Sequence, residues 1–127
     1  MTYRFDASAG LIVVAARLFG PTGDLIVRLA LDTGATTSLI NTEILVLLGY
    51  DPAASSDRIQ VTTGSGVEFC PRVIVKSIDA LGHSRTNFPI LCHTLPPTSQ
   101  VDGLLGLDFF RGCKLEIDLK NGTINVS

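Results

Sequence analysis

The sequence predicts a mainly β protein, and two observations support this. Valine, isoleucine and leucine cluster in short runs separated by Gly, Pro, Asn and Asp, which is the pattern of many strands joined by tight turns. Helical features are confined to two short stretches. The chain has 127 residues and contains no linker, repeat or low-complexity segment, so we expect a single domain over residues 1–127.

The first part of the chain alternates apolar runs with turn signals. Residues 11–19 and 25–31 are predicted to form a hairpin around Gly-Pro-Thr-Gly-Asp, a loop of ordinary length. A helix is predicted over residues 42–48, because Asn41 can cap its start and Gly49 suits its end.

The middle of the chain is predicted to be a loop followed by four strands. Residues 50–57 form the loop, and strands over 58–63 and 67–75 enclose Gly-Ser-Gly. A second pair of strands is predicted over 73–80 and 85–92, around Leu-Gly-His-Ser.

The C-terminal part is predicted to hold an irregular loop, a short helix and a hairpin. Residues 94–100 are the loop, and an apolar, glycine-containing strand then runs into a helix near 107–111, which Asp108 is expected to cap. The final hairpin turns at 120–122, and Asp118 opens that turn.

Charge and hydropathy exclude several classes of function. The net charge is −2 and there is no run of Lys or Arg, so we expect neither a nucleic-acid partner nor a membrane-surface partner. The apolar run over residues 11–18 is too short to span a bilayer, and because Arg17 interrupts it and only Arg4 lies upstream, we expect a strand and not a signal peptide. We therefore expect a cytoplasmic protein.

The cysteine pattern argues against a disulfide framework and against a metal site. Cys70, Cys92 and Cys113 are odd in number and widely spaced, which is typical of a reducing compartment. No Cys-x-x-Cys occurs, and Cys92-His93 has no partner pair at metal-ligand spacing. We expect no metal and no cofactor.

An acidic residue lies in the middle of the apolar segment Leu-Ala-Leu-Asp-Thr-Gly-Ala-Thr-Thr-Ser-Leu-Ile, at Asp32. One interpretation is a turn, because Asp can cap its own backbone and Gly accepts positive φ. The other interpretation is a catalytic carboxylate. The features farther along the chain favour the second.

Three features follow one another along the chain. A strand leads into Asp-Thr-Gly-Ala at 32–35, a glycine-tipped hairpin follows at 61–67, and Leu-Leu-Gly at 104–106 lies between a strand and a short helix. From about residue 11 to residue 126, the chain resembles the retropepsin-like aspartic proteases. These are the retroviral enzymes, their single-domain bacterial relatives and the protease domain of the DNA-damage-inducible ubiquitin shuttles.

The resemblance implies a closed-barrel acid-protease fold that is active as a two-fold homodimer. It also implies an aspartic endopeptidase that hydrolyses peptide bonds in extended polypeptide segments. One carboxylate takes a proton from the attacking water while the other gives a proton to the carbonyl oxygen. This chain has one Asp-Thr-Gly, so a second copy must supply the second Asp32, as an isologous dimer does.

The resemblance also assigns roles to the residues of the three features. Asp32 is the catalytic residue, and its loop is supported by Thr33, which braces the two loops across the axis, by Gly34, which lets substrate approach, and by Ala35, which keeps the mouth small.

The other two features cover the loop and support it from behind. The flap that opens and closes over a bound peptide comprises Thr63, Gly64, Ser65 and Gly66. The structural element under the loop comprises Leu104, Leu105 and Gly106.

The cleft of such an enzyme is expected to bind a peptide or an unfolded protein as an added strand. Few charged residues lie near the motifs, so hydrophobic residues are expected on both sides of the cut. The residues expected to make the cleft apolar are Leu31, Leu39, Ile40, Val67 and Leu104.

Two alternatives to the endopeptidase are considered. The first is a catalytically silent relative that keeps the fold as a dimerisation or peptide-binding module, although such a module does not need the buried acid. The second is a serine nucleophile at Ser65 with His83 or His93 as base, which lacks the Gly-x-Ser-x-Gly elbow.

Overall fold

The structure is a computed structural model that describes residues 1–64 and 66–127. It is mainly β, with 52% of residues in strands and 10% in helices, as the sequence predicts. The strands are β1 (Thr2–Arg4), β2 (Val13–Gly20), β3 (Gly23–Leu31), β4 (Leu39–Asn41), β5 (Arg58–Thr63), β6 (Gly66–Ala80), β7 (His83–His93), β8 (Gly103–Leu105), β9 (Leu115–Asp118) and β10 (Thr123–Val126). The helical elements are α1 (Thr42–Leu47) and the 3-10 helices η1 (Pro52–Ala54) and η2 (Leu107–Phe110).

A closed barrel forms the body of the described part of the chain. Its strands are hydrogen-bonded in the order β2, β3, β8, β4, β7 and β6, and β6 pairs with β2 again to close a barrel of six strands. β8 is parallel to β3 and antiparallel to β4. Closure explains the alternating burial along β2, in which every second residue faces the core.

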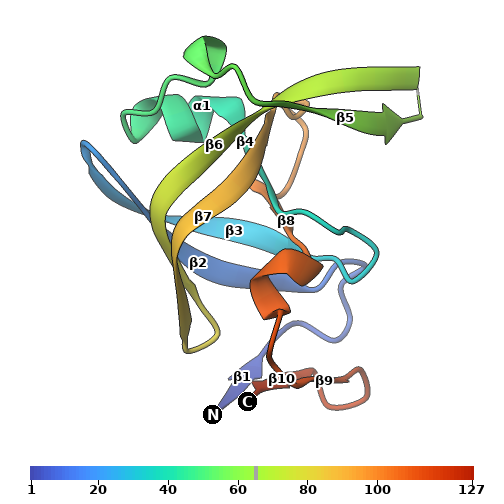
Figure 1. Cartoon of the computed structure of the whole chain (residues 1–127). Helices are drawn as coiled ribbons and strands as arrows, with labels where there is room; N and C mark the ends of the chain where they lie inside the picture. Colours follow the sequence, from blue (N-terminus) through green and yellow to red (C-terminus); the bar gives the residue numbers. More distant parts are fainter. Residues whose placement is uncertain (65) are drawn as a thin grey trace.

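A hairpin of β5 and β6 extends from one end of the barrel, and Figure 1 shows it at the top. β6 is one long strand, whereas the sequence predicted separate strands over 67–75 and 73–80. Its first part pairs with β5, and its second part turns into the barrel and pairs with β7 and β2. A single strand that joins two sheets therefore produces both predicted segments.

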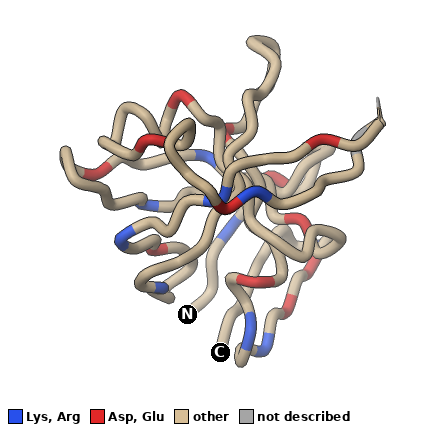
Figure 2. Tube along the Cα trace, turned by 45° about the horizontal axis from the view of Figure 1, so that its top comes forward, with Lys and Arg blue, Asp and Glu red and all other residues tan. Residues whose placement is uncertain are grey.

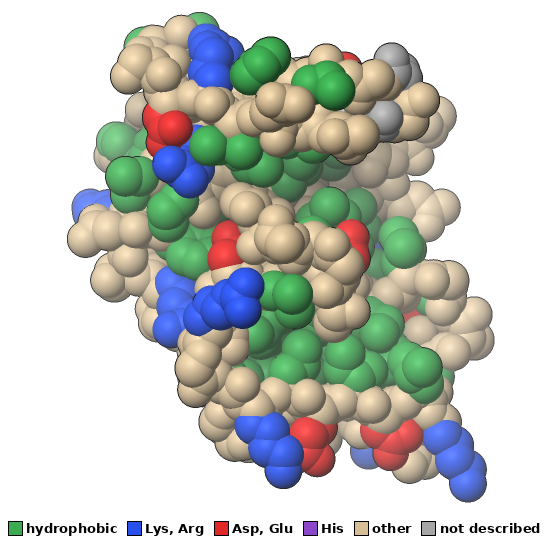
Figure 3. All heavy atoms as spheres, turned by 45° about the vertical axis from the view of Figure 1, so that its right-hand side comes forward, with side chains coloured by type: hydrophobic (Ala, Val, Ile, Leu, Met, Phe, Trp, Pro, Cys, Tyr) green, Lys and Arg blue, Asp and Glu red, His purple; other side chains and the backbone are tan. Residues whose placement is uncertain are grey.

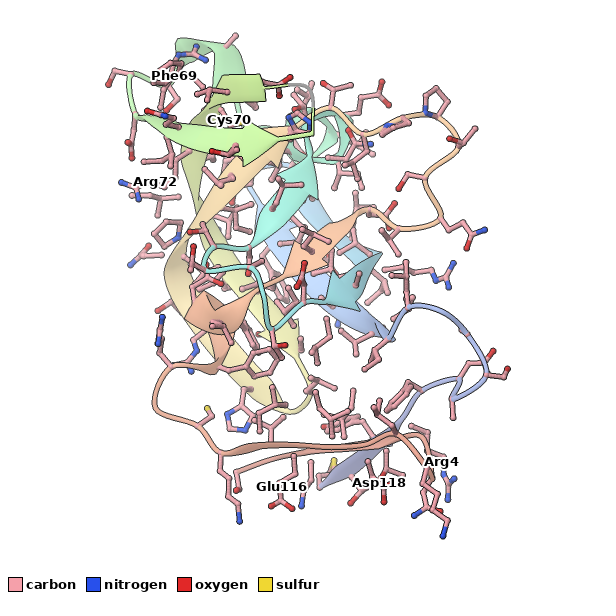
Figure 4. The ribbon with its side chains drawn as sticks, turned by 90° about the vertical axis from the view of Figure 1, so that its right-hand side faces the viewer. Arg4, Phe69, Cys70, Arg72, Glu116 and Asp118 are labelled. Carbon is pink, nitrogen blue, oxygen red and sulfur yellow. The ribbon has the colours of Figure 1, made fainter. Side chains whose placement is uncertain are left out.

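A smaller sheet lies at the opposite end of the molecule, where Figure 1 shows both chain termini. Its strand order is β1, β10, β9, and all pairs are antiparallel. β1 was not predicted from the sequence, because it is only three residues long. One face of this sheet packs on the core through Ile124 and Val126, which are buried. The register places Arg4, Glu116 and Asp118 on the other face, all of them exposed, and Figure 4 labels them there.

The single α-helix of the described residues agrees with the sequence. The Asn41 side chain accepts a hydrogen bond from the Glu43 N–H at 3.4 Å, and Gly49 follows the helix with φ of 92°. The predicted loop over 50–57 contains η1, which begins at Pro52 because proline is already set to a helical φ.

Charges of both signs are distributed over the molecule, and Figure 2 shows Lys and Arg interspersed with Asp and Glu along the trace. None of the described helices is long and apolar enough to cross a membrane.

Candidate active site

Asp32 directly follows β3 and begins a tight turn. Its N–H donates to the carbonyl of Leu105 at 3.0 Å, and its own carbonyl accepts from the Ala35 N–H at 3.2 Å. The Gly34 N–H donates to Asp32 Oδ1 at 2.9 Å. The carboxylate is therefore oriented by backbone, while the residue stays partly exposed to solvent. Turn geometry and an accessible carboxylate coexist at this position.

The other residues of the predicted loop lie around this turn. Thr33 and Gly34 are exposed, and Ala35 is half-buried. The Ala35 carbonyl accepts from the Leu107 N–H at 2.8 Å, which ties the loop to the segment after β8.

β8 and the glycines at its two ends lie directly behind the Asp32 turn. Leu105 is fully buried and Leu104 is half-buried. A Cβ built on Gly106 would lie 2.8 Å from the Ala35 carbonyl oxygen, and one built on Gly103 would overlap the Leu39 carbonyl oxygen. The backbones approach so closely that only glycine fits at either position.

A polar pair, the buried Ser38 and the half-buried Asp108, also supports the loop, and it was not predicted from the sequence. Ser38 has no exposed surface; its N–H donates to Asp108 Oδ2 at 2.9 Å and its Oγ to Asp108 Oδ1 at 2.7 Å. The Ser38 Oγ in turn accepts from the Gly106 N–H at 2.9 Å.

The expectation that Asp108 caps the last helix is wrong. η2 has Gly106 at its N-cap position, and no side chain caps it. Asp108 lies inside the first turn instead, where its carboxylate reaches Ser38. The available signal was a small polar residue, Ser38, inside an apolar stretch.

A cleft of about 410 Å³ opens beside the turn. Its walls come from the Asp32 loop, from β5 and from one residue of β7: Asp32, Gly34, Ala35, Thr36, Thr37, Ile59, Gln60, Val61, Thr62 and Leu91. Figure 3 shows that this face of the molecule is hollowed beneath the β5–β6 hairpin and that hydrophobic side chains are exposed along the hollow. A carboxylate and the underside of a hairpin thus share one cleft.

The lining of this cleft differs from the sequence expectation. Leu31 and Ile40 are buried in the core, and Val67 is exposed on the hairpin, so these residues do not line the cleft. Leu39 and Leu104 are half-buried in the barrel, also outside the lining. The apolar lining comes from Ile59, Val61 and Leu91, whose positions depend on how the hairpin folds over the loop.

The predicted flap falls on the tip of the β5–β6 hairpin. Thr63 ends β5 and pairs with Gly66, the first residue of β6. A Cβ built on Gly64 would meet nothing within 4 Å, and Gly66 has φ of 131°. Ser65 lies outside the described residues.

A second group of reactive side chains lies outside this cleft. Ligand atoms of Glu68, Cys70 and His93 all lie within 4.8 Å of one another. This group was not predicted from the sequence, because the strand pairing brings together residues more than twenty positions apart.

Comparisons with known proteins agree with this architecture. A family model described as aspartyl protease matches residues 14–109, which include Asp32, the hairpin and β8. Among solved structures, the crystal structure of a retropepsin-like aspartic protease from Rickettsia conorii matches with a TM-score of 0.71 and 17% sequence identity. That match covers 100% of this chain and 97% of the other chain, and it confirms the expected retropepsin-like fold. A comparison with curated protein sequences finds no match.

Proposed function

The chain belongs to the aspartyl protease family, and we propose that it is an aspartic endopeptidase that works as a homodimer with one Asp32 from each subunit. The observation that carries the proposal is the position of the Asp32 carboxylate. It is held by the Gly34 N–H at 2.9 Å, yet it faces a cleft that β5 partly covers. A carboxylate needed only to close a turn does not require a cleft beside it, whereas a catalytic carboxylate needs one to receive its substrate.

The chemistry requires two carboxylates that share one proton. The ionised carboxylate removes a proton from water, whose oxygen forms a bond to the peptide carbonyl carbon, and the protonated carboxylate gives its proton to the carbonyl oxygen. The C–N bond then breaks as the leaving nitrogen takes up the proton that the first carboxylate removed from water, and a hydroxyl of the tetrahedral intermediate returns its proton to the second carboxylate. Asp-Thr-Gly occurs once in the sequence, so the second carboxylate comes from a second copy.

Two features support a homodimer. Thr33 is exposed next to Asp32, where its hydroxyl can brace the loop of the other subunit. In the terminal sheet, β1 and β9 pair with β10, and within the described residues neither has another strand neighbour. Each edge strand offers backbone N–H and C=O groups that can extend the sheet into a second copy.

The substrate fits as an extended segment between the Asp32 loop and β5. Backbone hydrogen bonds position such a segment, and its side chains alternate between opposite sides. Ile59, Val61 and Leu91 make the cleft apolar, so we expect hydrophobic residues on both sides of the scissile bond.

The test is a digest of an unbiased peptide library with the wild type and Asp32→Asn in parallel. Asp51→Asn is the matched control, because Asp51 is an exposed acid whose side chain makes no cap hydrogen bond. We expect wild type and control to cleave at the same hydrophobic sites and Asp32→Asn to lose turnover by at least about a thousandfold.

The dimer is tested with the same preparation. Specific activity should fall on dilution as sedimentation shows the two-fold species dissociate, because each monomer holds only half of the site. Cleavage by Asp32→Asn, or full specific activity in a strict monomer, would contradict the proposal. If the wild type and Asp32→Asn both bind peptides and neither cleaves them, the chain is the silent binding module instead.

A further inference from the structure

Three different ligand types converge near the base of the hairpin. His93 Nδ1 lies 3.6 Å from Cys70 Sγ and 3.6 Å from Glu68 Oε2. All three ligand atoms lie within 4.8 Å of one another. A tetrahedral zinc ion with Zn–S near 2.3 Å and Zn–N near 2.0–2.1 Å separates its sulfur and nitrogen ligands by about 3.5 Å. The observed spacing already matches that requirement.

The strand geometry explains how these side chains meet. Glu68 and Cys70 are two positions apart on β6 and therefore share one face of the strand, while His93 ends β7. Figure 4 labels Cys70 on the hairpin, beside Phe69, which alternates to the other face and is 64% exposed. The group lines a hollow of about 470 Å³, whose other lining residues are Thr42, Phe69, Pro71, Cys92 and Thr94.

The group combines a shielded sulfur with an accessible entrance. Cys70 is only 3% exposed, whereas the side chains of His93 and Glu68 are 33% and 45% exposed. An ion can therefore enter from the Glu68 and His93 side and reach the thiol behind them. Three protein ligands leave a fourth position for water, which is typical of an open zinc site.

A catalytic Cys-His-Glu arrangement does not fit this geometry. In such a triad the nucleophile and the acid contact different nitrogens of the imidazole, so that the ring can relay a proton. Here Cys70 Sγ and Glu68 Oε2 both approach Nδ1. Burial, and secondly the nearby Glu68 carboxylate, raise the pKa of the Cys70 thiol, which keeps it protonated near neutral pH.

We propose that Glu68, Cys70 and His93 form a binding site for Zn²⁺ at the base of the β5–β6 hairpin. Sulfur, imidazole and carboxylate together are the ligand set of zinc, whereas magnesium and calcium take oxygen ligands. Binding replaces the Cys70 thiol proton by the metal, and that proton passes to solvent. The ion also compensates the negative charge that the thiolate and the Glu68 carboxylate would otherwise place side by side.

An ion at this site would connect the hairpin to the barrel. The strand partners of Glu68 and Cys70 on β5 are Val61 and Ile59, and both of these line the cleft beside Asp32. A bond from β6 to His93 on β7 would therefore fix the hairpin above the cleft. This consequence for catalysis rests on the proposed function, but the site itself does not.

The experiment titrates the full, reduced, metal-free chain with Co²⁺ and then displaces it with Zn²⁺. It uses the Asp32→Asn background, so that peptidase activity plays no part. We expect one Co²⁺ per chain, a thiolate-to-cobalt charge-transfer band and loss of that band on adding Zn²⁺. Affinity should increase with pH, because the metal competes with the thiol proton.

Variants assign the ligands. Cys70→Ser should abolish the charge-transfer band, while His93→Gln and Glu68→Gln should weaken binding by more than the about 10- to 100-fold typical of an outer-shell partner. The matched control is Cys113→Ser, which removes a thiol next to Arg85, away from this group, and should bind like the parent.

Two results would overturn the site. One is the absence of a thiolate band in the parent protein, and the other is unchanged affinity in both His93→Gln and Glu68→Gln. These two side chains are partly exposed, so their replacement tests the site even if Cys70→Ser does not fold. Circular dichroism verifies the fold of each variant.

Discussion

The two sides of the cleft are built in opposite ways. The Asp32 loop is held from behind by Leu105, by the Ser38–Asp108 pair and by two glycines at which even a methyl group does not fit. The β5–β6 hairpin extends away from the barrel, and within the described residues β5 pairs with β6 alone. A Cβ on Gly64 at its tip would meet nothing within 4 Å.

This contrast matches two requirements of the proposed hydrolase, one on each side of the cleft. A reacting carboxylate gains from a fixed position, because its orientation is set before the substrate arrives. A cover must move to admit a polypeptide and to release its products. The same substitution should therefore have very different effects on the two sides of the cleft.

The largest contrast is expected for one pair of glycine substitutions. Gly103→Ala places a methyl group against the Leu39 carbonyl oxygen between β8 and β4, and we expect it to lower the free energy of unfolding by about 4 kcal/mol or more. Gly64→Ala places the same group in open space and should change it by no more than about 0.5 kcal/mol. Urea unfolding of both variants measures the difference, and equal effects would remove the distinction between the two sides.

A smaller contrast is expected for two hydroxyl groups. Ser38→Ala leaves the buried Gly106 N–H without its acceptor and removes the hydroxyl donor to Asp108 Oδ1, which should together cost about 3 kcal/mol. Thr62→Ala on exposed β5 should cost less than about 1 kcal/mol. Thermal and urea unfolding of the two variants measure the difference in their free energies of unfolding. A near-neutral Ser38→Ala would mean that the pair does not support the loop.

The smallest predicted effect is a pH dependence of the free energy of unfolding, caused by the Cys92 thiol. Burial, followed by the proximity of Cys70, raises the pKa of the Cys92 thiol from 9.0 to about 11. Between these values the unfolded chain loses its proton while the folded chain keeps it, so stability should fall as pH rises, by less than about 3 kcal/mol. Unfolding measured from pH 8 to about 11 should show a weaker slope in Cys92→Ala. Cys113→Ala is the control for losing a thiol while Cys92 stays in place.

Much of the barrel could be predicted because its signals are local. The turn after β2, the cap at Asn41 and the apolar runs are each visible within a few residues, and the structure confirms them. The retropepsin-like fold followed from three motifs in a fixed order, which the family match confirms.

The features that could not be predicted from the sequence depend on contacts between residues far apart in the chain. Asp108 looks like a helix cap in sequence, yet its partner is Ser38, 70 residues earlier. Most of the apolar lining of the cleft comes from β5, whose position over the loop no local pattern reveals. The role of Asp32 in catalysis remains a prediction that the Asp32→Asn digest tests.

The distance along the chain between Ser38 and Asp108 also sets an order of events during synthesis. Contacts between residues so far apart form late, because a long loop must close before they are made. While a ribosome is still adding residues before Gly103, the Asp32 turn has neither β8 nor Asp108 behind it. Under the proposed function, the site would therefore be incomplete in the nascent chain, and the unfinished, still unfolded polypeptide would not be cleaved by its own Asp32.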